Sequence, residues 1–184
     1  MTRHTLVLGG ARSGKTAFAE RLALHSGHKP AYLATAKALD SEMADRVASH
    51  QTSRGDRFTT IEEPLALSPA LIRAAATHDV VLVDCLTLWI TNLLLAEENV
   101  SAAVSELVAT LAELDRARII LVSNEVGLGI VPDNAMARTF RDLAGSAHQR
   151  LAEICTDVFF VVAGLPMTLK GEAPERGEPK VHEA

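Results

Sequence analysis

The chain has 184 residues, of which 48% are hydrophobic and only 4% aromatic, and its formal net charge at pH 7 is -5. This length and composition predict one α/β domain with an aliphatic core. The acidic balance argues against a protein that binds nucleic acid or an anionic membrane surface, because such proteins usually carry a basic face. We therefore expect small-molecule partners and no nucleic-acid partner.

Two further features concern the compartment. The N-terminus lacks the charged, apolar and small-residue zones of a signal peptide, and the most apolar window, residues 80–96, is interrupted by Asp84 and Asn92. The two cysteines, Cys85 and Cys155, adjoin apolar stretches, as buried reduced thiols do. We expect a cytoplasmic protein without membrane insertion.

The first aliphatic run leads into the sequence GGARSGKT at residues 9–16. The spacing of Gly9, Gly14, Lys15 and Thr16 is that of a phosphate-binding loop, and a strand before it and helix formers after it are the context that supports the match. In such a loop, backbone N–H groups and the N-terminus of the next helix cradle phosphate oxygens. We expect Lys15 to reach the β- and γ-phosphates of a nucleotide and the Thr16 hydroxyl to bind Mg²⁺. A turn that binds nothing is the weaker alternative, because a turn does not need the Lys-Thr pair.

The sequence DSEMADRVASHQ predicts a helix with an unusual set of side chains. His50 follows Met43 and Val47 at helical spacing and continues an inward apolar stripe. Arg46 and Arg54 lie four residues to either side of His50 and would flank it if the helix persists. Neighbouring cations favour the neutral, nucleophilic imidazole and could also hold phosphates. On this geometry alone, a structural histidine is favoured over a nucleophile by about two to one.

Polar residues follow three of the later aliphatic runs. Asp84 ends the run VVLVD, where phosphate-loop proteins place a carboxylate for Mg²⁺, and an N-cap role for the helix from Leu86 is the alternative. Thr35 follows AYLA, and Asn124 and Glu125 follow IILVS. Such groups can face a nucleotide at the carboxyl edge of a parallel sheet, and turn or cap roles are about equally open to them.

Aliphatic runs alternate with amphipathic segments along the chain. Continuous runs, unlike alternating ones, suit strands that are buried on both faces. Ser68 and Pro69 predict the start of one helix, and Asp133 can begin a long helix that ends at Glu153. The predicted fold class is therefore α/β, a P-loop NTPase-type mostly parallel sheet covered by helices on both faces. The predicted strands are residues 5–8, 31–34, 80–83, 119–122 and 158–162.

The chain is expected to divide near residue 170. Residues 1–170 hold every predicted element and form one nucleotide-binding catalytic domain. Residues 171–184 are rich in Gly, Pro and Glu, a composition that predicts a disordered tail.

Six sequence blocks, in order from Leu6 to Lys170, resemble one enzyme family. The blocks are GGARSGKT, EMADRVASH, VDCLTLWITNLL, SNEVGLGIVP, FRDLAG and VAGLPMTLK. Together they resemble the bifunctional adenosylcobinamide kinase / adenosylcobinamide-phosphate guanylyltransferases of cobalamin biosynthesis. Six linked blocks are far more specific than a phosphate loop alone.

The resemblance implies two reactions at one nucleotide site that uses GTP, ATP and Mg²⁺. In the first, the γ-phosphoryl of ATP or GTP passes to the hydroxyl of the aminopropanol arm of adenosylcobinamide. In the second, a histidine attacks the α-phosphate of GTP, and the resulting GMP-histidine passes GMP to adenosylcobinamide phosphate, which gives adenosylcobinamide-GDP. The base of the kinase step stays open between Glu125, Asp84 and no base at all, since a loose transition state needs little base assistance. The resemblance also implies a homo-oligomer.

The resemblance assigns roles to individual residues. The nucleophile falls on His50, which reverses the odds given above, and Lys15 is the second catalytic residue. Thr16 and Asp84 are the metal ligands. Relatives commonly place arginines on both sides of the histidine, where this chain has Ser49 and Gln51. The implied nucleotide contacts are Gly9, Gly10, Ala11, Arg12, Ser13, Gly14, Lys15, Thr16, Ala34, Thr35, Ala36, Gln51, Thr52, Ser53, Arg54, Glu62 and Asp84.

Two other functions compete with this interpretation. One is a single-activity P-loop kinase for a small molecule, with His50 in a structural role. The other is a nucleotide-switched regulatory module. A Ras-like GTPase is disfavoured, because the sequence has no Asn-Lys-x-Asp guanine signature and Asp142–Gly145, the apparent switch motif, falls within a predicted helix.

Overall fold

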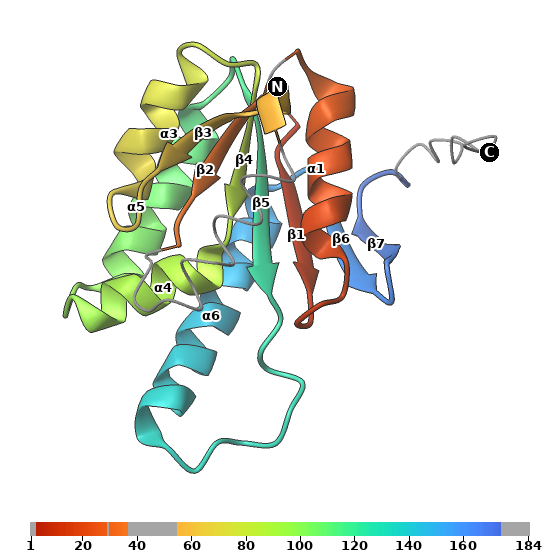
Figure 1. The fold of residues 1–184 in the computed structure, drawn as a ribbon. Helices are drawn as coiled ribbons and strands as arrows, with labels where there is room; N and C mark the ends of the chain where they lie inside the picture. Colours follow the sequence, from red (N-terminus) through yellow and green to blue (C-terminus); the bar gives the residue numbers. More distant parts are fainter. Residues whose placement is uncertain (1–2, 29, 37–54, 174–184) are drawn as a thin grey trace.

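A computed structural model describes residues 3–28, 30–36 and 55–173. The strands are β1 (Thr5–Gly9), β2 (Ala31–Ala34), β3 (Thr59–Glu62), β4 (Val80–Asp84), β5 (Arg118–Asn124), β6 (Asp157–Val162) and β7 (Leu165–Lys170). They form one seven-stranded sheet in the order β3-β2-β4-β5-β1-β6-β7 (Figure 1). All neighbours in this sheet are parallel except β6 and β7, which pair antiparallel.

Helices cover both faces of the sheet. The helical elements are α1 (Lys15–Ser26), the short 3-10 turn η1 (Gly55–Arg57), α3 (Leu67–Ala75), α4 (Leu86–Leu95), α5 (Val100–Glu113) and α6 (Ala135–Ile154). Helix α1 packs Phe18 and Ala19 against one face, while α3, α4, α5 and α6 pack against the other (Figure 1). The predicted fold class is therefore confirmed: a mostly parallel sheet with helices on both sides.

The aliphatic runs explain the centre of the sheet. The core strands β1, β2 and β4 are buried along nearly their whole length, because neighbouring strands and helices on both faces remove them from water. All five predicted strands are present, extended by two residues at most at either end.

The two edge strands were missed. β3 alternates between half-buried and exposed residues, and β7 is exposed along nearly its whole length. An edge strand is not buried on both faces, so it lacks the continuous apolar run that marks the central ones. Pro166 within β7 also argues against a central strand and is tolerated at an edge.

Two helices begin one or two residues away from their predicted first residues. Helix α3 begins at Leu67, so Ser68 is not its N-cap and lies in the first turn. The carboxylate of Glu63 accepts the N–H groups of Leu65 and Ala66, which orders the turn that leads into this helix. Helix α6 begins at Ala135, and Asn134 rather than Asp133 is the N-cap, because its side chain accepts the Ala137 N–H.

Both cysteines are buried free thiols, as predicted. Burial raises the pKa of Cys155 to about 12 and also raises the pKa of Cys85. Both thiols are therefore held in their protonated, unreactive form near neutral pH. Within residues 3–28, 30–36 and 55–173, no helix combines the length and apolar character needed to cross a membrane. Most of the predicted disordered tail, residues 174–184, lies outside the described residues.

A buried histidine ties strands to helix at the amino edge of the sheet. The Ile119 N–H donates to Nδ1 of His4, so Nε2 carries the ring proton and donates to the Leu111 carbonyl at 2.9 Å. Desolvation lowers the pKa of His4 below its usual 6.5. Protonation of the ring in the folded state would break the bond from Ile119.

We expect His4 to make stability depend on pH. Because the pKa of His4 is lowered in the folded state, the unfolded chain takes up the proton first, and stability is lost as the pH falls from 6.5 toward the folded-state pKa. The loss has a slope of at most about 1.4 kcal/mol per pH unit. In urea unfolding between about pH 7.5 and about pH 5.5, the free energy of unfolding should fall less steeply in His4→Gln than in wild type. Equal slopes would contradict a buried neutral His4.

Candidate functional site: the carboxyl edge of the sheet

Strand register gathers the predicted site residues at one edge. Ala34 lies opposite both Glu62 and Asp84, so β2, β3 and β4 end level with one another. Gly9 at the end of β1 lies opposite Asn124 of β5. The carboxyl ends of parallel strands necessarily share an edge, and the glycine-rich loop emerges from its middle.

The loop after β1 has the conformation of a phosphate cradle. The Ser13 N–H donates to the Gly10 carbonyl, and Arg12 and Gly14 have φ angles of 54° and 92°, in the left-handed region. Helix α1 begins at Lys15, and Gly14 carries no side chain that could cap its first N–H groups. These N–H groups and the positive end of the helix are therefore available to an anion.

Two glycines of the loop are fixed by close packing. A Cβ at Gly9 would come within 2.6 Å of both Ser13 Oγ and the Val161 carbonyl. A Cβ at Gly14 would lie 3.0 Å from Cα of Gly164, in the turn between β6 and β7. The Gly164 N–H donates to the Ser13 carbonyl at 2.8 Å. The turn between β6 and β7 thus packs against the glycine-rich loop and hydrogen-bonds to it.

Two side chains of the loop fit a nucleotide phosphate. Lys15 is 8% exposed, and its Nζ donates to the Gly10 carbonyl at 3.0 Å, which leaves further N–H donors on the ammonium group. Ser13 Oγ is buried, and no described residue hydrogen-bonds to it. Since buried polar atoms are normally paired, an unpaired hydroxyl inside the loop is a feature that a bound ligand would explain.

Asp84 receives two hydroxyl groups from other elements. Its Oδ2 accepts the Thr16 hydroxyl from α1 at 3.1 Å and the Tyr32 hydroxyl from β2 at 2.6 Å. The N-cap alternative for Asp84 is wrong, because α4 begins at Leu86 with Cys85 as its N-cap. Thr16 and Asp84 therefore meet, as two groups that share one Mg²⁺ must.

Thr35 is held by the end of β4. Its hydroxyl donates to the Cys85 carbonyl at 2.7 Å and accepts the Cys85 N–H at 2.9 Å. Its own carbonyl accepts from Asn92 Nδ2, which also donates to Pro64. Of the roles left open for the Thr35 side chain, the structure shows the structural one.

The polar pair after β5 is also engaged. Asn124 Nδ2 donates to the Thr87 hydroxyl at 2.9 Å. The Glu125 carboxylate accepts the N–H groups of Gly127 and Leu128 and closes a turn. Both side chains thus stabilise the edge itself.

Several predicted site residues lie outside the described residues. These are His50, Gln51, Thr52, Ser53 and Arg54, together with Arg46. Ala36 is the last described residue before that segment, and η1 is the first described element after it. Glu62 is exposed at the end of β3. Their roles stay predictions.

Sequence reasoning missed three residues of the edge. Tyr32 holds Asp84, Asn92 holds the segments after β2 and β3, and His148 on α6 hydrogen-bonds to the Ser123 hydroxyl at 2.7 Å. Burial lowers the pKa of His148 and favours its neutral form. Each is a polar residue in or facing an apolar stretch, and that mismatch is the signal that could have found them.

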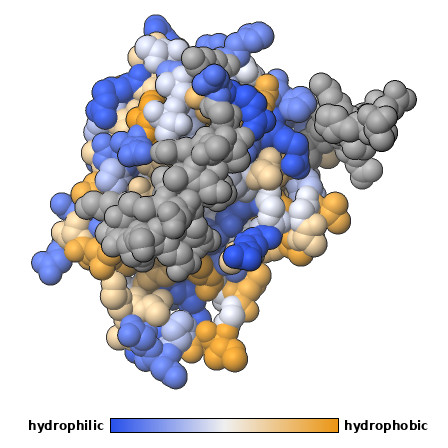
Figure 2. Space-filling view, in the orientation of Figure 1, coloured by the Kyte–Doolittle hydropathy of each residue, from blue (hydrophilic) through white to orange (hydrophobic). Residues whose placement is uncertain are grey.

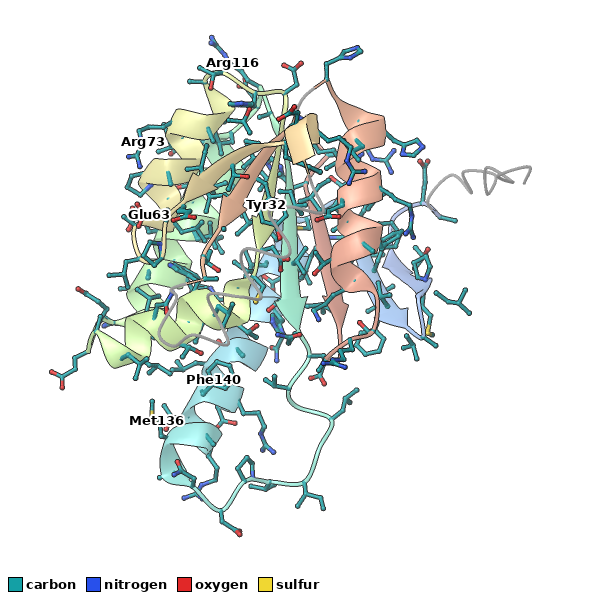
Figure 3. All side chains as sticks on the ribbon, in the orientation of Figure 1. Tyr32, Glu63, Arg73, Arg116, Met136 and Phe140 are labelled. Carbon is teal, nitrogen blue, oxygen red and sulfur yellow. The ribbon has the colours of Figure 1, made fainter. Side chains whose placement is uncertain are left out.

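An apolar hollow of about 230 Å³ lies between α4 and α6. Met136 and Phe140, which line it, project from the first half of α6 (Figure 3). Its wall is almost entirely apolar and includes no residue of the glycine-rich loop. It therefore does not suit phosphates and is distinct from the edge described above.

Substitution by alanine tests the close packing of Gly9, and the adjacent Gly10 provides the comparison. We expect Gly9→Ala to lower the free energy of unfolding by about 1–3 kcal/mol, because the new methyl group overlaps Ser13 and Val161. Gly10→Ala is the matched control, since a Cβ there has no heavy atom within 4 Å. Urea unfolding of both variants without nucleotide measures the difference. Equal effects of the two substitutions would contradict the packing.

Structural comparison shows the fold. A KaiC-like protein from Pyrococcus horikoshii OT3 matches 86% of this chain and 70% of its own with a TM-score of 0.52 and 14% identity. A prototypical ATPase from the type III secretion system of pathogenic bacteria matches 90% of this chain and 56% of its own with a TM-score of 0.51 and 13% identity. Both proteins share the mostly parallel sheet with its helices, and at such low identity the likeness extends to the fold alone.

Sequence comparison shows the family. The family model described as cobinamide kinase / cobinamide phosphate guanyltransferase matches residues 5–169. The bifunctional adenosylcobalamin biosynthesis protein CobP of Pseudomonas aeruginosa is 52% identical over 169 residues, 91% of this chain and 97% of its own. The corresponding protein CobU of Escherichia coli is 36% identical over 180 residues, 90% of this chain and 98% of its own. The predicted resemblance is confirmed, and the chain belongs to the cobinamide kinase / cobinamide phosphate guanyltransferase family.

Proposed function

We propose that this chain catalyses both reactions of its family at the carboxyl edge of the sheet. It phosphorylates adenosylcobinamide with ATP or GTP and then transfers GMP from GTP to adenosylcobinamide phosphate. The observation that carries the proposal is a phosphate loop already shaped around an unpaired Ser13 hydroxyl, with Thr16 in contact with Asp84.

Mg²⁺ would be held by Thr16 and Asp84. Among the described residues, no cluster of three or more His, Cys, Asp or Glu side chains could hold a metal. This set nevertheless suits Mg²⁺, which usually keeps several waters and takes only one or two carboxylates besides substrate phosphates. When bound, the ion would neutralise charge on the phosphates in both reactions.

In the kinase step, the chain acts chiefly by positioning and electrostatics. Lys15, the loop N–H groups and the N-terminus of α1 would hold the phosphates and stabilise the charge on the transferred γ-phosphoryl. Asp84 and Glu125, the two candidate bases, both accept hydrogen bonds from other groups. We infer that the step runs without a protein base, because a loose transition state needs little base assistance.

In the second step, His50 would act as the nucleophile. A neutral ring nitrogen attacks the α-phosphorus of GTP, the bond to the β-phosphate oxygen breaks, and pyrophosphate leaves. A phosphate oxygen of adenosylcobinamide phosphate then attacks the same phosphorus, and the P–N bond breaks to restore the histidine. Covalent catalysis of this kind divides one transfer between two anionic partners into two easier steps.

The remaining assignments follow the same proposal. The nucleotide would contact the loop from Gly9 to Thr16, the ends of β2, β3 and β4 at Ala34–Ala36, Glu62 and Asp84, and residues 51–54. Residues 1–170 would form the catalytic unit, residues 171–184 would lie outside it, and the protein would work in the cytoplasm.

Alkali-stable labelling tests the nucleophile. Incubation with Mg²⁺ and GTP labelled at the α-phosphate should leave label on wild type that survives alkali and is lost in acid, as a phosphoramidate is. Adding adenosylcobinamide phosphate should discharge it. His50→Ala should retain no label yet still phosphorylate adenosylcobinamide, whereas Lys15→Ala should lose at least about a hundredfold in both activities.

His25→Ala is the matched control, because His25 is exposed on the last turn of α1 and should label like wild type. Wild type that binds GTP and keeps no label would point to a single-activity kinase. Absence of both activities, with GTP still bound, would favour a nucleotide-switched module.

We further propose that the protein is a homo-oligomer whose contact includes β7. Leu165, Met167 and Leu169 are 71%, 55% and 59% exposed on this edge strand. Leu165 and Met167 alternate onto one face, and Leu169 follows at the register shift after Thr168. Figure 2 shows apolar surface at this margin and at the lower end, over the connection from β5 to α6. Apolar stripes of this kind are usually covered by another chain.

Size-exclusion chromatography at micromolar concentration tests the oligomer. Wild type should elute above the mass of one chain, and Met167→Glu should shift toward the monomer, because a charge would be buried in an apolar contact. Thr168→Glu, on the opposite face of β7, should leave the elution unchanged. A wild type that elutes as a monomer would rule the oligomer out.

A further inference from the structure

Tyr32 is a buried residue of β2 whose hydroxyl reaches Asp84 at the carboxyl edge of the sheet. It lies in β2 opposite Leu82 of β4, and Asp84, two residues further along β4, is on the same face as Leu82. The tyrosine side chain extends along the sheet toward the carboxyl edge and donates its hydroxyl proton to Asp84 Oδ2. Figure 3 shows Tyr32 in this central position, between α1 and the strands.

The position of the hydroxyl is fixed by packing. Tyr32 is 4% exposed and lies within the core on the α1 side of the sheet. The ring of Phe58, which follows η1, meets the Tyr32 ring edge-on, with centroids 5.8 Å apart and planes at 83°. Because the enclosed ring has little freedom to turn, the Tyr32 hydroxyl is held in one position, from which it donates its hydrogen bond.

The bond from Tyr32 is the stronger of the two that Asp84 accepts. At 2.6 Å it lies in the short range of charge-assisted O–H···O⁻ bonds, whereas the Thr16 bond at 3.1 Å exceeds the usual O–H···O distance. Both bonds end on Oδ2. Within the part of the chain that the structure describes, no donor reaches Oδ1, so one oxygen of Asp84 is anchored and the other remains available.

We propose that Tyr32 is a positioning residue for the metal site: its hydroxyl fixes the Asp84 carboxylate so that Oδ1 can hold Mg²⁺ or a water bound to it, while Thr16 presents its oxygen to the same ion. The inference rests on the proposed function, in which Thr16 and Asp84 hold Mg²⁺ at the nucleotide. In this proposal Tyr32 acts through Asp84, to which it donates its hydroxyl proton, as residues behind metal ligands commonly do.

Tyr32→Phe removes this hydroxyl and keeps the ring that packs on Phe58. The dissociation constant of a fluorescent GTP analogue is measured in EDTA and in Mg²⁺. The value in EDTA divided by the value in Mg²⁺ reports how strongly the metal assists binding. We expect this ratio to fall about tenfold in Tyr32→Phe, the lower end of the loss seen when a partner of a metal ligand is removed. The affinity in EDTA should stay at the wild-type value.

Two further variants make the outcome specific. Trp89→Phe removes another buried aromatic donor, which binds the Leu65 carbonyl at 2.8 Å in the core on the opposite face, and should keep the wild-type ratio. Asp84→Asn should lower the ratio at least as far as Tyr32→Phe does.

The possible failures are distinguishable. If Asp84→Asn lowers the ratio and Tyr32→Phe does not, the role of Tyr32 is refuted and the metal site stands. If Tyr32→Phe weakens binding equally in Mg²⁺ and EDTA, Tyr32 has only a structural role. If wild type binds the analogue equally well in both, the metal site of the proposed function fails as well.

Discussion

Hydrogen bonds to the carboxylate of Asp84, at the end of β4, join the sheet to its first helix. A carboxylate at the rim of an apolar core needs donors, and it takes them from α1 through Thr16 and from β2 through Tyr32. Because α1 also begins with Lys15, this junction fixes the phosphate loop relative to the strands. The candidate metal ligands, the lysine and the helix terminus thus keep one geometry.

The rest of the edge is held by hydrogen bonds among its own polar groups. Thr35 binds both backbone groups of Cys85, Asn92 binds two carbonyls, and Glu125 binds two N–H groups of its own turn. Buried or half-buried polar groups satisfied in this way resist rearrangement. A ligand therefore meets donors that are already oriented, which lowers the cost of ordering them on binding.

Sequence reasoning succeeded where one physical requirement determined the residues. Central strands must be apolar on both faces, so their runs were visible, and the loop needs glycines, lysine and threonine in sequence, so residues 9–16 were found. It failed for β3 and β7, because edge strands share their composition with loops. The role of Tyr32 was not predicted, because it depends on strand order: β2 neighbours β4, although β3 lies between them in the chain. No local pattern carries that information.

The contact between Gly14 and Gly164 limits which side chain residue 14 can carry. The turn between β6 and β7 is Ala163-Gly164, with φ angles of 52° and 78°, and turn geometry alone would also accept asparagine at the second position. Here a side chain at residue 14 would have its Cβ 3.0 Å from the Gly164 backbone, and the Gly164 N–H donates to the loop. A Cβ at Gly164, in contrast, would have no heavy atom within 4 Å. The steric constraint therefore acts on the phosphate loop: the backbone of a hairpin from the far end of the chain keeps residue 14 a glycine, while the hairpin turn itself has room for a side chain.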